Sequence, residues 1–429
     1  MLLPIHCSLR RKSRRGATVV LVAVCLTVIL AFVAIAIDGG GLLEQRRQAQ
    51  ATADAAALAA AEDLFWNYPQ NKGLDTGGTA VGRALAIASA NGYTNNATNS
   101  VVTVRVSPQN YDGGPHAGTA LPKGYAEVTV QYNQPRFFSA VIGTGTIPVK
   151  ARSVGRGKWE PSFVGIHVLD LHASSALRAT GGGTGGVSGG ATVIVNSDAG
   201  DAAVTTGGST IASSNFAITG GISGGGFIGP VNLGTPPQPD PLRNIPEPNQ
   251  SDYSDQANGP KHFSNGNKTI SPGVYHGGIS ITGQANVTML PGIYYMDGGG
   301  FSMTGQGNLL ANGVMIYNAP KGPSDVINIS GSNGGSVTMS PPTSGLYKGL
   351  TLFQERSATQ DLSVSGNGGF FVTGTFYAAG ALMNITGNGA GQIGSQYISN
   401  LLDINGGGAL NIDYNVNQVI PRRIWGLVE

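Results

Sequence analysis

The strongest hydrophobic signal in the chain is an uninterrupted apolar segment at residues 17–37. It contains 21 residues without a charged side chain. As an α-helix it would be about 30 Å long, which matches the hydrocarbon core of a bilayer. A buried core helix is the alternative, but such helices rarely run this far without a polar face. The pattern therefore predicts a transmembrane helix that begins at Ala17 and ends at Ile37.

A basic leader, residues 1–16, precedes this segment. Arg14 and Arg15 close a run of five basic side chains in six positions, and positive charge beside a membrane helix favours the cytoplasmic side. We therefore expect a single-pass protein of the cytoplasmic (inner) membrane. Its N-terminus would lie inside, and the bulk after Asp38 would reach the periplasm or the cell surface. Processing stays open, because Ala36 ends an A-x-A signal-peptidase site and Gly16 is a second candidate position.

Alanine dominates the next segment, residues 38–66. Nine alanines fall within the 13 positions 49–61, and alanine has the highest helix propensity. Glycines at 39–41 loosen the backbone ahead of it, so we expect a helical stalk after the span. Two arrangements remain open: a surface helix that extends from the membrane, or a stalk that packs against identical or related helices.

Residues 67–157 carry a mixed pattern that predicts a small α+β domain. An apolar stretch at 80–90, ended by Asn91-Gly92, predicts a short helix. Alternation of apolar and polar residues predicts half-buried strands. The expected strands are 101–106, 126–132, 136–142 and 146–153.

A short unit recurs through residues 160–420, in which apolar and small polar residues alternate before Thr, Ser or Asn and then Gly. One β-strand in each repeat of about 20–25 residues indicates a solenoid. We expect a parallel, right-handed β-helix with aliphatic side chains inside and glycine at the corners. A disordered glycine-rich tail is the alternative, but it would lack the recurrent aliphatic positions. The predicted corner glycines are Gly283, Gly305, Gly331, Gly366, Gly387 and Gly406.

A proline-rich segment interrupts these repeats at residues 230–260. We expect it to form an extended linker or loop. It would separate a first solenoid lobe, residues 160–229, from the main β-helix, residues 261–420. The fold class predicted for the whole chain is therefore mainly β, after an N-terminal helical part and a small α+β domain.

Composition supports this architecture and excludes several classes of protein. Glycine supplies 67 of the 429 residues, about twice its usual share, but without the strict third-position period of collagen. Charged residues reach 11% and the net charge is +2, which argues against a nucleic-acid partner. Of the two cysteines, Cys7 precedes the apolar run and Cys25 lies within it, so they form no disulfide framework.

Acidic residues in the repeat region are scattered. Hydrolysis of a glycoside usually requires two carboxylates about 5–10 Å apart. Asp297 and Asp403 suit turn roles, and Glu355-Arg356 suits a surface ion pair. The other single acids of this region are Asp325, Asp361 and Asp413.

The histidines show no tight ligand spacing. The closest pair, His167 and His172, lies beside Asp170, and the sequence contains no H-E-x-x-H, G-x-S-x-G or Walker motif. We therefore expect no catalytic residue, no cofactor and no metal site. A polysaccharide lyase or glycosidase is the alternative.

The N-terminal part also resembles a known family. The residues concerned are Arg15-Gly16, Ile37-Asp38-Gly39, Arg46-Arg47-Gln48-Ala49 and the run Asp54, Ala55, Ala56, Ala57, Leu58, Ala59, Ala60 and Ala61. This combination resembles the Tad domain of TadE/TadG-like Flp pilus-assembly proteins. The resemblance covers roughly residues 14–157 and implies one membrane span followed by an alanine-rich helix.

Together these features predict a membrane-anchored envelope protein of the Tad/Flp pilus-assembly type. We expect a structural or adhesive role for its exported β-helix. The expected partners are the lipid bilayer, pilus-assembly or other envelope proteins, and surface glycans. The alternative is a carbohydrate-active or carbohydrate-binding β-helix protein at the cell surface.

Overall fold

The computed structural model describes residues 15–141, 143–160, 162–330, 335–366, 369–387, 391–406 and 410–429. Arg14, most of the basic leader and Gly331 lie outside the described residues. The chain divides into two compact units. The first comprises Met1–Lys158 with Ile424–Glu429, and the second comprises Trp159–Arg423.

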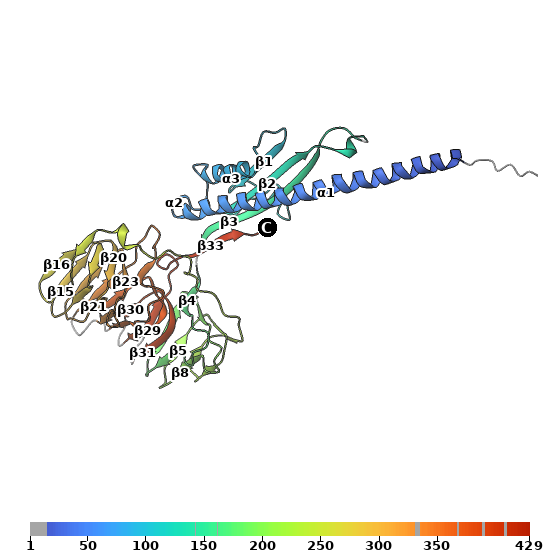
Figure 1. Ribbon diagram of the computed structural model, residues 1–429. Coiled ribbons are helices and arrows are strands. Elements are labelled where there is room, and N and C mark those ends of the chain that lie inside the picture. Colours follow the sequence, from blue (N-terminus) through green and yellow to red (C-terminus); the bar gives the residue numbers. More distant parts are fainter. Residues whose placement is uncertain are drawn as a thin grey trace, which may run out of the picture. The chain divides into compact units, whose positions relative to one another are not determined.

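A single long helix dominates the first unit (Figure 1). Helix α1 spans Arg15–Trp66, 52 residues in all. The segments predicted as a membrane span and a separate stalk are therefore one continuous helix that passes through the glycines at 39–41. Each glycine costs about 1 kcal/mol of helix propensity, and the apolar residues before them and the alanines after them outweigh this cost.

The rest of the first unit is a small α+β fold, and its sheet includes a C-terminal strand that the prediction of an α+β domain at 67–157 left out. Its helices are α2 (Tyr68–Asn71) and α3 (Thr79–Ala90). Four strands form a sheet in the order β1-β2-β3-β33, with β1 and β2 antiparallel and β2 and β3 antiparallel. The strands are β1 (Ser100–Val106), β2 (Tyr125–Gln134), β3 (Ile147–Glu160) and β33 (Arg422–Leu427).

One predicted strand of this unit is wrong. The segment expected as a strand at 136–142 contains the 3-10 helix η1 (Phe138–Val141), and Ile142 lies outside the described residues. The backbone N–H groups of Phe138 and Ser139 donate to the Asp38 carboxylate on α1, at 3.2 and 2.7 Å. These bonds give the N–H groups a partner on the helix in place of a neighbouring strand.

The second unit is built from parallel strand pairs. Each run of about 20 residues, here called a rung, adds one strand to each of three ladders, and neighbouring rungs pair in parallel. The first and second ladders belong to a 19-stranded sheet and the third is a 10-stranded sheet among the described residues. Such parallel sheets are consistent with a β-helix.

The strands of the first ladder follow in spatial order. They are β14 (Asp255–Ala257), β17 (Gly273–His276), β20 (Gly292–Asp297), β23 (Val314–Ala319), β26 (Leu350–Gln354), β29 (Thr375–Gly387), β31 (Gln396–Asn405), β4 (Val164–Val168), β7 (Thr192–Val195), β10 (Asn215–Ile218) and β13 (Val231–Leu233).

The second ladder shares the long strands β29 and β31 with the first. Its other strands are β15 (Lys261–Phe263), β18 (Ile279–Ile281), β21 (Phe301–Met303), β24 (Ile327–Ser330), β27 (Leu362–Gly366), β5 (Leu177–Thr180), β8 (Ala203–Thr205) and β11 (Ile222–Ser223). The third ladder consists of β16 (Asn267–Ile270), β19 (Asn286–Met289), β22 (Leu309–Ala311), β25 (Val337–Met339), β28 (Phe370–Val372), β30 (Gly391–Ile393), β32 (Leu410–Asp413), β6 (Thr184–Ser188), β9 (Thr210–Ala212) and β12 (Phe227–Ile228).

The spatial order of the rungs differs from their order along the chain. Strand β31, near the C-terminus, pairs with β4 and β5, the first strands of the unit. The regions expected as two lobes therefore share the same sheets. The chain leaves the stack at β13 and resumes at β14, at the far end of the same ladder.

Inward-pointing apolar side chains fill the space between the ladders. In β18 and β21 the alternate residues Ile279, Ile281, Phe301 and Met303 are at most 2% exposed, as period-2 alternation requires. The same core continues through the rungs at both ends of the stack. The alternating aliphatic pattern is therefore the source of the core of the second unit.

Candidate functional site

The N-terminal part of α1 is apolar and uncovered. Among the described residues it is the helix long and apolar enough to cross a membrane. Its large apolar side chains from Val19 to Ile37 are 43–71% exposed. The helix begins at Arg15 and includes Ala17, and Asp38 directly follows the apolar run and binds the η1 segment. Helix α1 continues past Asp38 to Trp66, so its bounds do not mark the ends of the span, and Ala17 and Ile37 stay predicted limits.

The alanine motif on α1 packs against other segments of the same chain. Ala56, Ala57, Ala60 and Ala61 are fully buried, whereas Asp54, Ala55, Leu58 and Ala59 are partly exposed. Ala56, Ala57 and Ala60 belong to one core with side chains of α3 and β2. The two expected arrangements were a surface helix and a stalk packed against identical or related helices. Neither describes this packing, because the motif is buried against its own α+β unit.

Two glycines on β3 allow the helix to approach the sheet very closely. A Cβ at Gly155 would lie 2.3 Å from the carbonyl oxygen of Ala57, and one at Gly157 would lie 1.8 Å from that of Ala61. Only a residue without a side chain fits at this distance. The contact between α1 and β3 is therefore made through alanine and glycine backbones.

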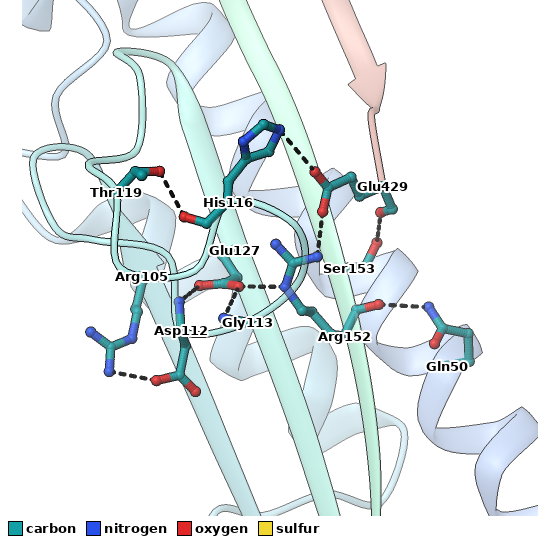
Figure 2. A network of polar contacts seen from close by, with 10 residues as sticks. All are labelled: Gln50, Arg105, Asp112, Gly113, His116, Thr119, Glu127, Arg152, Ser153 and Glu429. Carbon is teal, nitrogen blue, oxygen red and sulfur yellow. Dashed lines mark hydrogen bonds and ion pairs between the residues drawn. The ribbon is translucent and has the colours of Figure 1, made fainter.

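A polar network lies on β2 and β3 near this contact (Figure 2). Glu127 on β2 is 1% exposed and accepts from the backbone N–H groups of Asp112 and Gly113, at 2.6 and 3.1 Å. The Arg152 Nε donates to its Oε1 at 2.5 Å. Burial opposes the charge of Arg152, but hydrogen bonds to Glu429 and Glu127 outweigh it and raise the pKa of the guanidinium.

The same arginine connects three segments of the first unit. Its Nη1 donates to Glu429, and its carbonyl oxygen accepts from Gln50 Nε2 on α1 at 2.9 Å. The backbone of Glu429 accepts from Val154 N at 2.9 Å. The network therefore fixes the chain end to β3 and β3 to α1, which is a structural role.

A column of aromatic rings runs along the outward face of the first ladder. The aromatic column consists of Tyr295, Tyr317, Phe353 and Tyr377, which are in register on successive strands. Consecutive ring centroids are 5.0–5.2 Å apart. An exposed column of this kind would be a natural platform for sugar rings or apolar ligands.

The proline-rich segment covers this column. We call residues 235–254 the strap. Its Leu242 and Ile245 are 2% exposed and belong to the same cluster as the aromatic rings. The Tyr377 hydroxyl donates to Asp240 at 2.6 Å, and Arg356 donates to the carbonyl oxygens of Leu242 and Ile245, at 2.8 and 2.5 Å. The segment expected as a linker is thus a packed part of the second unit.

A charged cluster that the sequence did not reveal lies at the end of the first ladder. His276 is held between Asp297, with Nδ1 to Oδ2 at 2.6 Å, and Asp255, with Nε2 to Oδ1 at 3.2 Å. Lys321 Nζ also donates to Asp297 at 2.7 Å. The bond to Asp297 raises the pKa of His276 above its ordinary value of 6.5, and the Asp255 carboxylate adds to this. One sequence feature could have identified this cluster: Asp255, His276 and Asp297 are spaced 21 residues apart, which is the length of one rung.

Asp297 of this cluster is poorly suited to proton donation. Burial opposes the charge of Asp297, but hydrogen bonds from Lys321 and His276 outweigh it and lower its pKa. A general acid requires the opposite shift. Asp403 pairs with Arg178, and Asp325 accepts from the backbone of Lys321 and Gly322.

One acid has a raised pKa. Burial raises the pKa of Glu355, and the nearby charge of Glu247 adds to this. Arg356 contacts Glu247, not Glu355, with Nη1 to Oε1 at 3.5 Å. The expected Glu355-Arg356 ion pair is therefore replaced by a contact between the sheet and the strap.

The two candidate histidines lie in different surroundings. Burial lowers the pKa of His167 to about 4, whereas His172 is exposed and lies 3.1 Å from Asp198. Within the described ranges no group of three or more His, Cys, Asp or Glu side chains could hold a metal ion. His167 lines a cavity of about 310 Å³ together with Asp240 and Arg423.

The predicted corner glycines that the structure describes fall into three groups. Gly283 and Gly406 have φ of +58° and +152° and so occupy backbone conformations that favour glycine. Gly305 instead allows close stacking, because its Cβ would lie 2.5 Å from the Gly283 carbonyl oxygen. Gly366 and Gly387 end strands and pair with each other in register.

Comparison with known proteins identifies one region of the chain. Residues 16–63 match the family model Tad, described as "Putative Flp pilus-assembly TadE/G-like". The match covers most of α1, including the apolar run and the alanine motif. No curated protein and no solved structure matches the chain.

Proposed function

We propose that this chain is a membrane-anchored envelope protein of the Tad/Flp pilus-assembly type. The observation that carries the proposal is the coincidence of the Tad match at 16–63 with one helix, α1. The first part of that helix is apolar and exposed, and the second part is the packing surface of an α+β unit. A helix with this division both anchors a domain and positions it close to the bilayer.

The second unit acts outside the cytoplasm in this proposal. The basic residues before the span favour a cytoplasmic N-terminus, so everything after α1 is exported across the inner membrane. The absence of cysteine after Cys25 in the sequence suits an oxidising compartment.

The second unit forms a right-handed parallel β-helix that presents a surface, in a structural or adhesive role. The outward column of the second ladder supports this, because successive rungs place small uncharged side chains in register. They include Ser280, Ser302, Asn328, Ser363 and Asn384. Such a face offers hydrogen-bonding groups at the spacing of adjacent strands, about 4.8 Å. It suits a protein or glycan partner that is bound through short-range contacts, because the uncharged side chains provide little long-range electrostatic attraction.

We also propose that the chain is not an enzyme. The lowered pKa of Asp297 and the pairing of Asp403 with Arg178 support this. The strap further supports it, because it fills the aromatic face on which a β-helix could otherwise hold a sugar chain.

Membrane topology tests the first part of the proposal. A membrane-impermeant maleimide is applied to intact spheroplasts that carry the full chain. In a Cys25→Ser background, Cys7 should react only after the membrane is permeabilised. A Cys7→Ser, Cys25→Ser chain with Ser251→Cys on the exposed strap should react at once. Labelling of Cys7 in intact cells, or protection of Ser251→Cys, would refute the orientation.

Pilus assembly tests the second part. In a strain that lacks the chain, Flp pili and surface attachment should be lost and wild-type protein should restore both. Leu26→Arg with Leu30→Arg, in the exposed apolar half of α1, should not restore them. The matched pair Leu26→Val with Leu30→Val keeps the apolar surface and should restore them. Normal pili in the deletion strain would rule out the pilus role.

A further inference from the structure

The η1 segment belongs to a loop, residues 135–146, that joins β2 to β3. We call it the η1 loop. Two adjacent phenylalanines near its start are uncovered, with Phe137 68% exposed and Phe138 49% exposed. Exposing this much apolar ring surface to water is unfavourable. Exposed rings of this kind usually have a partner.

The η1 loop is fixed to α1 at the point where the apolar run ends. The Asp38 carboxylate accepts from the backbone N–H groups of Phe138 and Ser139. Side chains of Ile37, Arg136 and Phe137 line one small cavity at this point. The two phenylalanines are therefore held beside the residue at which the predicted span leaves the hydrocarbon.

We propose that Phe137 and Phe138 insert into the boundary between lipid headgroups and acyl chains, so that the bilayer is the partner of the η1 loop. A helix over 17–37 is about 30 Å long and fills the hydrocarbon core, which places Asp38 at the boundary. Aromatic rings with a neighbouring basic residue are favoured there. Arg136 supplies that base beside the rings, and its guanidinium can bind lipid phosphates.

This second contact changes what the anchor can do. A single helix that crosses a bilayer leaves its domain free to rotate about the helix axis. Two phenylalanines held to the side of the helix by Asp38 fix both the rotation and the depth of the first unit. The membrane therefore orients the α+β unit as well as retaining it.

A spin label at Phe137 tests this in the full chain, reconstituted in nanodiscs that contain phosphatidylcholine and phosphatidylglycerol. The variant is Phe137→Cys in a Cys7→Ser, Cys25→Ser background. Electron paramagnetic resonance compares label collisions with oxygen, which concentrates in lipid, against a nickel chelate, which stays in water. One control places the label at native Cys25 in the span. The other uses Lys123→Cys, an exposed position that precedes the opposite end of β2.

We expect the ratio of oxygen to nickel collisions at Phe137 to be several-fold higher than at Lys123 and lower than at Cys25. A ratio equal to that at Lys123 would overturn the proposal, because the loop would then lie in water. Few collisions with both reagents would also overturn it, because protein would cover the loop.

This inference rests on the membrane placement of α1. If the label at Cys25 is itself in water, the anchor fails together with the loop; if only Phe137 is in water, the anchor stands and the loop contact fails. Unchanged hydrogen exchange in β2 confirms that the labelled variant is folded.

Discussion

Replacing Gly157 by alanine tests the contact between α1 and the sheet. An ideal Cβ at this position would lie 1.8 Å from the carbonyl oxygen of Ala61 and 2.9 Å from the backbone nitrogen of Phe65. Ordinary van der Waals contact begins at 3.4 Å, so the two backbones would have to separate by about 1.6 Å at this point. A side-chain rotation cannot relieve the contact, because the partner is the main chain of a helix.

The expected loss of stability follows from what this separation uncovers. Overpacking usually costs about 1–3 kcal/mol. Moving α1 also reduces the packing of five fully buried methyl groups on the helix, and each is worth about 0.8 kcal/mol. These are Ala53, Ala56, Ala57, Ala60 and Ala61. We expect Gly157→Ala to lower the free energy of unfolding of the first unit by about 2–4 kcal/mol.

Hydrogen exchange measured by mass spectrometry resolves this effect by segment in the full chain. Peptides from β2 should exchange about 30-fold faster or more, since 1.4 kcal/mol is a factor of ten. Peptides from β29 and β31, in the second unit, should not change. The matched control is Gly82→Ala inside α3, where nothing lies within 4 Å of the new Cβ. It should stabilise the helix by about 0.5–1 kcal/mol. Exchange in Gly157→Ala within about threefold of wild type would refute the close contact.

Three further changes test other parts of the molecule. Glu127→Gln removes the buried carboxylate charge that accepts from Arg152 Nε and from two backbone N–H groups, while Glu429 still pairs with Arg152, so it should cost about 1.5–3 kcal/mol of unfolding free energy in the first unit; Asp112→Asn, at a half-exposed ion pair, should cost at most about 1 kcal/mol, and equal effects on exchange in β2 would contradict this reasoning. His276 has a raised pKa, so its ion pairs stabilise the folded state fully below about pH 6.5 and lose this effect as pH rises through the folded-state pKa. Exchange at 273–297, corrected for the intrinsic pH dependence of amide exchange, should accordingly quicken as the pH rises above 6.5 in wild type and less so in His276→Gln, and an identical pH dependence would exclude His276 as the cause. Tyr377→Phe removes the hydroxyl that binds Asp240 and should release the strap by about 1–3 kcal/mol, seen as faster limited proteolysis at 240–250; unchanged cleavage would show that the ring alone holds the strap.

Local patterns in the sequence were sufficient to predict several elements of the first unit. A helix over 17–37 was predicted from the length of an uninterrupted apolar run. The helix at 80–90 and the strands at 101–106 and 126–132 were predicted from local apolar and polar patterns. The strand expected at 136–142 was wrong because a contact with Asp38, about 100 residues away, decides its conformation. The continuity of α1 through 39–41 was missed because glycine propensity was weighed without the flanking helix formers.

The candidate sites were harder to predict than the elements. The alanine run at 53–61 was recognised as a motif, but its partner was not, because the glycines that receive it lie on β3 at 155 and 157. The cluster around His276 was missed because its members are one rung apart and therefore far apart in the sequence.

The sequence by itself determined which segments are apolar, which form helices, and which face of each strand lies inside. These properties depend on side chains only a few residues apart. Tertiary structure decided which rung lies beside which, so that β31 pairs with β4 and the proline-rich segment covers the aromatic column. The physical reason is that parallel backbone hydrogen bonds are the same for every residue type. Strand patterns identify the rungs, but only the packing of the complete chain selects their order.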